Sequence, residues 1–494
     1  MSTPFVTPPR RDRLRSIARR AMLARGLLPD FSAAVHTQLD AIRGAAHDEN
    51  SEIRDLRGLL WASIDNDDSR DLDQLSVALR TAGGAVRILV AVADVDAIVK
   101  ASSAIDDHAR ANTASVYTAA EIFSMLPERL STDLTSLGEG QRRLAIITDI
   151  TIGEAGTVQS SEVYRAVVVN RAKLSYDSLA GWLNAEHAAP EQVLAVPGLD
   201  ESLRTQDAVA QAMNAVRHEH GVLSLDTSEA RTIFQHTELA DLKLDPRNRA
   251  KDLIENFMIA VNGVTTRYLE QKGFPTLRRV LRAPERWARI VELASDVGEP
   301  LPSEPNAAAL EAFLQKRLAV APENFSDLSL SVVKLLGRGE YELGLPGGGV
   351  ASHFGLAVKD YTHSTAPNRR FPDLITQRLL KAALAGRPQP YSNQELSALA
   401  QYCTEQEDKA TKIERQVRKS EAALLLESRI GERFDAMVTG ASPKGTWARI
   451  LQPFAEGKIV AAARDLDVGQ HVRVELVHTD VERGFIDFAR VERP

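Results

Sequence analysis

The hydrophobic pattern of the first 45 residues predicts two short amphipathic helices. Between residues 12 and 25, apolar side chains recur at helical spacing, and Gly26 suits the end of this helix. A second helix is expected after Ser32, a favourable N-cap residue. The apolar positions of the two helices are Leu14, Ile17, Ala18, Ala21, Met22, Val35, Leu39 and Ile42. This pattern predicts a small helix-turn-helix-like domain over residues 1–60, whose basic face could contact RNA or could be a solvated arginine face without a partner.

From about residue 61 the pattern changes to apolar runs that alternate with helical segments. Residues 87–94, 144–152 and 163–176 read as buried or half-buried strands, whereas residues 250–273 read as a helix. A charged stretch, residues 392–430, is rich in Ala, Leu and Glu and predicts a further helix. No fixed repeat period indicates a solenoid. We therefore expect a mixed α/β domain over residues 61–430.

The last 60 residues switch to short strands with alternating apolar positions. This pattern predicts a closed β-barrel of the OB-fold type over residues 431–494. Phe434, Trp447, Arg449 and Phe454 could form a platform for single-stranded nucleic acid, or the aromatic rings could be barrel core. The fold class expected for the whole chain is thus multidomain α+β.

Composition narrows the possible locations and partners. The 494 residues, 44% of them apolar, suffice for several cores, and 60 basic against 67 acidic side chains leave nucleic acid binding open. Cys403 is the only cysteine, so an intramolecular disulfide is excluded. No segment has the roughly 20 apolar residues that cross a membrane, and the arginine-rich start lacks the apolar core of a secretory signal. We expect a cytoplasmic protein.

The most informative segment is an acidic cluster at residues 63–75. It holds five aspartates, at positions 65, 67, 68, 71 and 73. Ile64, Leu72 and Leu75 lie among them, which indicates that part of the segment points inward. Buried carboxylates repel one another unless a cation neutralises them, and oxygen ligands favour magnesium or manganese.

A calcium-binding EF-hand loop is the alternative for this segment. Starting such a loop at Asp65 places Arg70 where glycine is needed and Ser76 where the bidentate glutamate is needed. The mismatch at both positions favours a hydrated magnesium ion that shares phosphate oxygens with a substrate.

A second segment, residues 353–380, carries complementary charge. Pro367 favours an extended bend, and Arg369 and Arg370 follow it directly before a helix. Arginines at such a turn can hold a phosphate bidentately, although adjacent arginines are more often ion-pair partners. Together with the acidic cluster, they supply what phosphoryl transfer to water requires.

Six blocks of this chain, in the same order, resemble the ribonuclease II family of exoribonucleases. They are IDNDDSRDLDQ, HARANTASVY, MLPERLSTDLTSL, AKLSY, KDLIENFMIAVN and YTHSTAPNRRFPD. The resemblance runs from about residue 55 to the end. It implies an RNB-type catalytic domain and processive 3′-to-5′ hydrolysis of single-stranded RNA to nucleoside 5′-monophosphates, in RNA degradation or processing. It also implies Mg2+ as the cofactor, with Mn2+ possible. We expect no membrane association and no obligate protein partner, hence a monomer.

The resemblance also implies roles for individual residues. Asp65, Asp71 and Asp73 match metal-binding carboxylates, and Asp73 and Asp71 are the catalytic pair. Arg369 matches the arginine that contacts the scissile phosphate. Gln74 stands at the position of the family's fourth metal aspartate, where its amide oxygen is a weaker ligand.

Six further residues are candidates for RNA contact. Tyr117 matches a tyrosine that stacks at the 3′ end, Tyr176 and Glu255 match residues that hold the terminal nucleotide, and Leu225 replaces a stacking phenylalanine of some relatives. Arg370 and Trp447 complete the set. Each residue also has a purely structural alternative, such as a buried tyrosine or a helix-face carboxylate.

Gln74 leaves a rival function open. A chain that had lost its metal site would be a catalytically impaired RNA-binding protein on the same scaffold. The retained Asp65, Asp71, Asp73 and Arg369 favour the enzyme, because an idle site has no reason to keep such charge repulsion.

Overall fold

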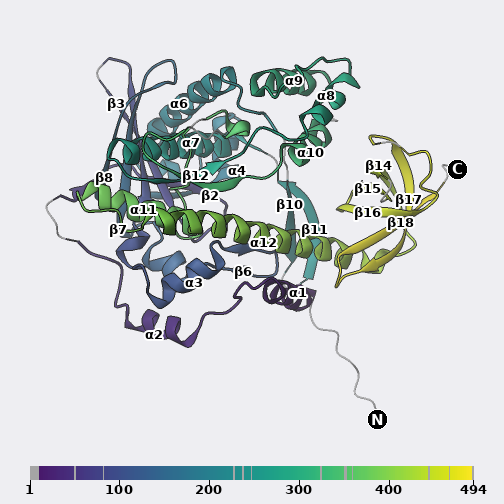
Figure 1. Ribbon diagram of the computed structural model, residues 1–494, viewed down its shortest axis with the longest axis horizontal. Helices are drawn as coiled ribbons and strands as arrows, with labels where there is room; N and C mark the ends of the chain where they lie inside the picture. The colour runs from purple at the N-terminus through teal and green to yellow at the C-terminus, as the bar shows by residue number, and fades with distance from the viewer. Residues whose placement is uncertain are drawn as a thin grey trace, which may run out of the picture.

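A seven-stranded sheet, a long helix and a small barrel organise the protein (Figure 1). The computed structural model describes residues 10–48, 52–81, 83–225, 229–235, 238–245, 247–322, 325–349, 353–358, 360–442, 445–466 and 468–491.

The sheet has the strand order β1-β8-β7-β4-β3-β2-β9. Its strands are β1 (Arg54–Asp55), β2 (Ala62–Asp65), β3 (Gln74–Arg80), β4 (Val86–Ala93), β7 (Arg142–Ile152), β8 (Val158–Val169) and β9 (Ala172–Ser175). Neighbours are antiparallel except for the pairs β1–β8 and β2–β9. The strands predicted at residues 87–94, 144–152 and 163–176 are confirmed, the last one as two strands separated at residues 170–171.

One hydrophobic core joins this sheet to helices from distant parts of the chain. Those helices are α3 (Ala104–Asn112), α4 (Tyr176–Leu183), α6 (Leu199–Glu219), α7 (Arg249–Gln271), α11 (Phe371–Leu384) and the first part of α12 (Asn393–Leu426). Strands β4 and β7 are buried along most of their length, which explains their nearly continuous apolar sequence. The helix predicted at residues 250–273 is therefore confirmed as α7.

Several smaller elements surround this core. They are α5 (Glu191–Leu194), β5 (Val116–Tyr117), β6 (Ile122–Phe123), β10 (Glu229–Gln235), β11 (Glu238–Asp245), β12 (Thr276–Val280), β13 (Glu340–Gly344), α8 (Trp287–Ser295), α9 (Ala307–Val320) and α10 (Phe325–Leu336). Helices α8, α9 and α10 form a separate apolar cluster around Trp287 and Phe313.

Helix α12 connects the sheet to the barrel (Figure 1). It starts with a capping box in which Ser392 and Glu395 satisfy each other's backbone N–H groups. The barrel closes in the order β14-β15-β16-β18-β17, as predicted for an OB-fold. Its strands are β14 (Arg433–Ser442), β15 (Gly445–Leu451), β16 (Phe454–Ala461), β17 (His471–Asp480) and β18 (Phe485–Val491). One pair, β16–β18, is parallel.

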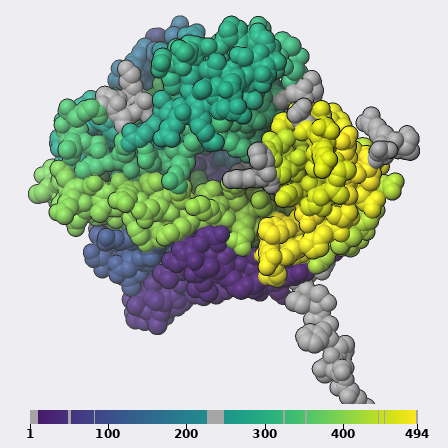
Figure 2. All heavy atoms as spheres, turned by 45° about the vertical axis from the view of Figure 1, so that its right-hand side comes forward, coloured from purple at the N-terminus to yellow at the C-terminus, as the bar shows by residue number. Residues whose placement is uncertain are grey.

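The two N-terminal helices are confirmed as α1 (Arg10–Ala24) and α2 (Ala33–Ala41). Ser32 caps α2 by accepting the Val35 N–H. The two helices pack against different partners, and their helix-turn-helix-like arrangement stays a prediction. Helix α1 lies against α12 and reaches the edge of the barrel (Figure 2), whereas α2 lies against α3, where Gln38 accepts the Ile105 N–H.

Helix α1 is held in the body of the protein by its buried apolar stripe, which belongs to clusters shared with α12 and the barrel, and exposed ion pairs add to this contact. Arg13 pairs with Glu427 and Glu482, and Arg20 pairs with Glu482 at the end of the barrel. The arginine-rich face that could have contacted RNA thus forms ion pairs within the chain. Among the described residues, no helix combines the length and the apolar content that crossing a membrane requires.

Candidate active site

The acidic segment folds inward between strands β2 and β3. Strand β2 ends at Asp65, whose Oδ1 accepts the Ser69 hydroxyl at 2.8 Å. Farther along, the Leu72 N–H donates to Ser136 Oγ at 3.0 Å, and the Leu72 side chain is buried. These contacts confirm the prediction that the interleaved apolar residues turn part of the segment toward the interior.

Asp73 is the most buried carboxylate of the segment, with 2% of its surface exposed. Its Oδ1 accepts the Asn368 N–H at 3.0 Å, while its Oδ2 has no hydrogen-bond partner and lies 3.5 Å from Arg369 Nε. Burial raises the pKa of Asp73 to about 7; Asp71 and Asp373 also raise it, against the opposing effects of Arg369 and the Asn368 N–H. An ionised Asp73 therefore needs additional positive charge.

Asp71 lies next to an aromatic ring that remains open to solvent. Burial raises the pKa of Asp71, and the charge of Asp65 adds to this effect. The Tyr117 hydroxyl donates to Asp71 Oδ2 at 3.4 Å, and Tyr117 keeps 39% of its surface exposed. A partly exposed ring beside a carboxylate pair is a suitable surface for a nucleobase.

Backbone pairing brings Tyr117 and Arg369 together from distant parts of the sequence. The Ser115 N–H donates to the Arg369 carbonyl at 3.0 Å, and the Phe371 N–H donates to the Thr113 carbonyl at 2.8 Å. The segment before Tyr117 therefore runs alongside the turn that carries Arg369. Sequence spacing could not show this contact, because the two segments are about 250 residues apart.

The two adjacent arginines point in different directions. Arg369 has a side chain that is 43% exposed and faces Asp73. Arg370 donates to Asp373 Oδ1 at 2.8 Å, and the same oxygen accepts the Ala366 N–H at 2.8 Å. Arg369 is therefore available to a phosphate, whereas Arg370 fixes the turn from inside.

Tyr176 and Glu255 have different surroundings. Tyr176 begins α4, and burial and the charge of Asp65 raise its pKa, which places the ring near the acidic cluster. Glu255, on α7, accepts hydrogen bonds from Arg217 at 3.3 Å and from Arg247 at 2.8 Å. Its carboxylate is thus held in one orientation by two arginines.

Leu225 and Trp447 belong to other parts of the fold. Leu225 packs against the apolar cluster of α8, α9 and α10, so only part of it is accessible. Trp447 is half-buried on β15, in the barrel. Of the other platform candidates, Phe434 is barrel core and Arg449 lies over the half-buried Phe454 ring while pairing with Asp327.

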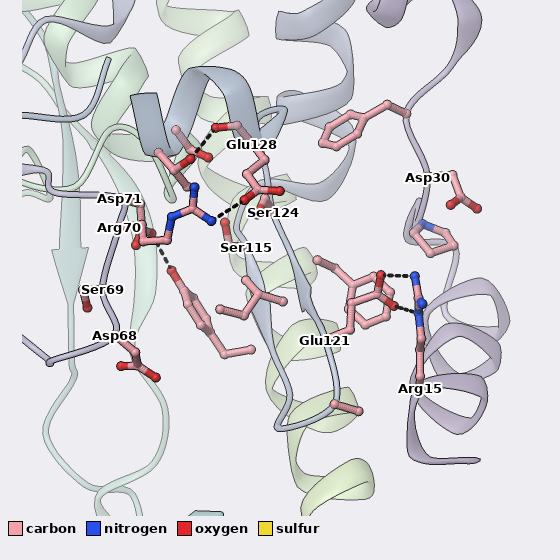
Figure 3. Close-up of a pocket in the computed structure, with 18 of the residues that line it drawn as sticks. Arg15, Asp30, Asp68, Ser69, Arg70, Asp71, Ser115, Glu121, Ser124 and Glu128 are labelled. Atoms are coloured by element: carbon pink, nitrogen blue, oxygen red, sulfur yellow. Dashed lines mark hydrogen bonds and ion pairs between the residues drawn. The ribbon is translucent and has the colours of Figure 1, made fainter. Parts of the chain in front are cut away.

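A cleft of about 1380 Å³ opens beside Asp71 and Tyr117 (Figure 3). Three arginines and six carboxylates line it: Arg11, Arg15, Arg70, Asp12, Asp30, Asp68, Asp71, Glu121 and Glu128. This excess of negative charge attracts cations, which would neutralise it beside a phosphate group.

The oxygen ligands of the acidic cluster are of the type that a hard divalent cation prefers. Asp65, Asp71 and Asp73 offer carboxylate oxygens, and the buried Asp73 Oδ2 lacks a hydrogen-bond partner. Within the described part of the chain, no three His, Cys, Asp or Glu side chains converge as a complete ligand cage. Magnesium usually binds through one or two carboxylates and keeps water and phosphate oxygens as its other ligands, so the set suffices. Gln74 starts β3 and is half-buried.

The roles of two residues of this site were not predicted from the sequence. The Asn368 N–H fixes Asp73, and the side chain of Asp373, with no exposed surface, anchors both Ala366 and Arg370. Their position beside the arginine pair was visible in the sequence, but their contacts depend on the fold of the turn.

The comparisons with known proteins agree with this geometry. The model of the RNB domain matches residues 53–386, about two thirds of the chain. The chain belongs to the RNB-domain family. The model of the RNase II-type exonuclease C-terminal S1 domain matches residues 432–491, the barrel.

Curated relatives of this RNB-domain protein include two bacterial ribonucleases R. The chain is 27% identical to Ribonuclease R of Aquifex aeolicus, over 89% of this chain and 65% of that protein. It is 28% identical to Ribonuclease R of Escherichia coli, over 93% and 60%. The chain thus spans somewhat less than two thirds of the length of these relatives.

Solved structures show the same fold at low sequence identity. Mycoplasma genitalium RNase R in complex with ribose-methylated single-stranded RNA has a TM-score of 0.87 at 21% identity, with 97% of this chain and 78% of that chain covered. Yeast Ssd1, described as a pseudonuclease, has a TM-score of 0.70 at 17% identity, with 90% and 55% covered.

Proposed function

We propose that this RNB-domain protein is a 3′-to-5′ exoribonuclease that hydrolyses single-stranded RNA processively to nucleoside 5′-monophosphates. The observation that carries the proposal is the buried Asp73, whose unpartnered Oδ2 faces Arg369 beside the exposed Tyr117. The relatives named Ribonuclease R and the RNA-bound structure of Mycoplasma genitalium RNase R support the assignment.

The 3′-terminal nucleotide binds by stacking and by contacts to its ribose. The exposed ring of Tyr117 stacks on a base, and Tyr176 directly follows Ser175, which pairs with Asp65 across β2 and β9. Glu255, oriented by Arg217 and Arg247, accepts a hydrogen bond from a ribose hydroxyl. Stacking and 2′-hydroxyl contacts favour RNA without favouring a sequence. Leu225 and Trp447 remain proposed RNA contacts, whereas Arg370 supports the site through its bond to Asp373.

Hydrolysis takes place between Asp73 and Arg369. Asp65, Asp71, Asp73 and the Gln74 amide would hold Mg2+, or Mn2+, which when bound acidifies water and neutralises phosphate charge. Asp73 orients the attacking water and accepts its proton. As the water oxygen bonds to phosphorus, the bond from phosphorus to the preceding 3′ oxygen breaks. Arg369 donates to the phosphate oxygens while their negative charge grows, and the new 3′ hydroxyl takes a proton from solvent.

The proposal also covers the roles of the domains, the location of the protein and its oligomeric state. We assign residues 61–430 to catalysis, residues 431–494 to an RNA-binding barrel and residues 1–60 to a helical region. We infer a cytoplasmic monomer without a membrane or an obligate protein partner, acting in RNA degradation or processing.

A denaturing gel with 5′-labelled single-stranded RNA tests the activity. The purified protein is incubated with magnesium, with a chelator, or as the variant Asp73→Asn. The proposal expects magnesium-dependent conversion of full-length RNA to short 5′-labelled end products with few intermediates, which the variant lacks. Uncleaved RNA in every lane would overturn it.

A catalytically impaired RNA-binding protein is the second candidate. It is favoured by Gln74 in place of a fourth carboxylate and by the fold shared with Ssd1, described as a pseudonuclease. A native gel separates the two candidates: RNA that is retarded but stays intact with magnesium supports the second one.

A further inference from the structure

The Tyr117 ring is carried by a hairpin too small to hold its own position. Strands β5 and β6 have two residues each, and Tyr117 pairs with Ile122 across them. Isolated two-stranded hairpins, even longer ones, are marginally stable in water. Neighbouring elements must therefore fix the ring relative to Asp71.

Helix α12 holds the inner side of this hairpin through two carboxylates. The Tyr117 N–H donates to Glu414 Oε1 at 2.9 Å, and the Ala119 N–H donates to Glu421 Oε1 at 3.4 Å. These bonds tie the hairpin backbone to α12. The Ala120 carbonyl and the Glu121 carboxylate are left to another partner.

Helix α1 supplies that partner with three arginines. Arg15 donates from Nε and Nη2 to the two carboxylate oxygens of Glu121, both at 2.9 Å (Figure 3). Arg11 donates to the Ala120 carbonyl at 3.1 Å, and Arg19 lies 3.9 Å from Glu121. A bidentate arginine–carboxylate pair fixes orientation as well as distance.

Apolar packing joins the same three elements. Residues from α1, the hairpin and α12 share one buried cluster, which contains Ala18, Ala21, Met22, Val116, Phe123, Ile413 and Val417. The hairpin is thus clamped between α1 and α12, and its strand β5 carries the exposed ring of Tyr117.

We propose that α1 is a positioning element for Tyr117, with Arg15 and Glu121 as its positioning residues. The consequence for RNA binding rests on the proposed function, whereas the structural statement does not. The arginine-rich helix thereby acts on the substrate indirectly, by holding the hairpin, rather than as a nucleic-acid surface.

A spectroscopic experiment tests the positioning directly. The full chain carries 3-fluorotyrosine at position 117, and its 19F NMR signal is compared among Arg15→Ala, Glu121→Ala and the double variant. The signal is expected to shift in both single variants and to shift no further in the double variant, because one interaction is lost in all three. Arg15→Lys, which keeps the charge but not the bidentate geometry, should recover part of the shift. Because the Arg15 side chain is 52% exposed, its removal leaves the core intact.

The matched control removes another exposed ion pair of the same chain. Arg54 on β1 pairs with Glu162 on β8, away from the hairpin, so Arg54→Ala should leave the 19F signal unchanged. An unchanged signal in Arg15→Ala and Glu121→Ala would overturn the proposal.

Kinetics with unlabelled protein tests the consequence for RNA. The Arg15→Ala variant should raise KM by about two- to fivefold at unchanged kcat, the range for losing one exposed ion pair that supports ground-state binding. A 19F shift in a protein that degrades no RNA would support the role of α1 while refuting the exoribonuclease. A change in kcat alone, without a 19F shift, would overturn the positioning role.

Discussion

Replacing Asp73 by asparagine should stabilise the metal-free protein at neutral pH. The pKa of Asp73 in the folded protein is about 7, against about 3.9 for an unfolded aspartate. Between these values the folded chain binds more protons than the unfolded chain, so the free energy of unfolding falls as pH rises through this window. Asparagine has nearly the same shape, keeps an acceptor for the Asn368 N–H and carries no charge.

The size of the effect follows from the difference in pKa. Roughly three pKa units at about 1.4 kcal/mol each give about 4 kcal/mol as an upper bound above pH 7, and almost nothing at pH 4. Asparagine also loses the attraction to Arg369 Nε, 3.5 Å away, and this attraction is already included in the raised pKa. A gain of about 1–4 kcal/mol at pH 8 is therefore expected.

Urea denaturation in the presence of a chelator, at several pH values from 4 to 8, measures this effect. Asp67→Asn, at an exposed position of the same segment, is the matched control and should not stabilise the protein at pH 8. Magnesium should stabilise the natural protein more than Asp73→Asn, because binding to the folded state adds to its stability. Equal stabilities of the natural protein and Asp73→Asn at pH 8 would refute the reasoning about the buried charge.

Three further predictions concern activity. Arg369→Ala should lower kcat by about 10²–10³-fold in single-turnover hydrolysis, because a preorganised donor to the transition state is lost. Arg369→Lys should recover only part of this loss, and an unchanged kcat in Arg369→Ala would contradict the role of the side chain. Tyr117→Ala should weaken binding of a noncleavable oligonucleotide by about 5- to 150-fold through lost base stacking, whereas equal affinity would show that the ring does not contact RNA. Gln74→Asp should lower the magnesium concentration that half-saturates activity, because it adds a charged oxygen ligand; an unchanged titration curve would place position 74 outside the metal site.

Local patterns in the sequence predicted most of the architecture. The helical stripe of Leu14, Ile17 and Met22 is buried in α1, and Ser32 caps α2, because capping and amphipathic spacing are local properties. The nearly continuous apolar runs correspond to β4 and β7, which are buried along most of their length. The packing of α1 against α12 was not predictable, since an apolar stripe does not show which distant surface covers it, and the ion-pair partner of Arg13, Glu427, is more than 400 residues away.

The site was predictable in composition but not in geometry. The spacing of Asp65, Asp71 and Asp73 pointed to a cation, and the structure buries Asp73 next to Arg369. The sequence did not show which of the two adjacent arginines, Arg369 or Arg370, faces the carboxylates. That choice depends on Asp373, which holds Arg370 on the inner side of the turn.

The identity of the first released product tests the central claim most directly. The protein, with magnesium in water enriched in oxygen-18, is given single-stranded RNA whose 3′-terminal nucleotide is unique in the strand, and early products are resolved by liquid chromatography and mass spectrometry. The account predicts that this nucleotide appears first, as a nucleoside 5′-monophosphate with one oxygen-18 atom in its phosphate. Release from the 5′ end, a cyclic phosphate, or bound RNA without any released nucleotide would contradict it.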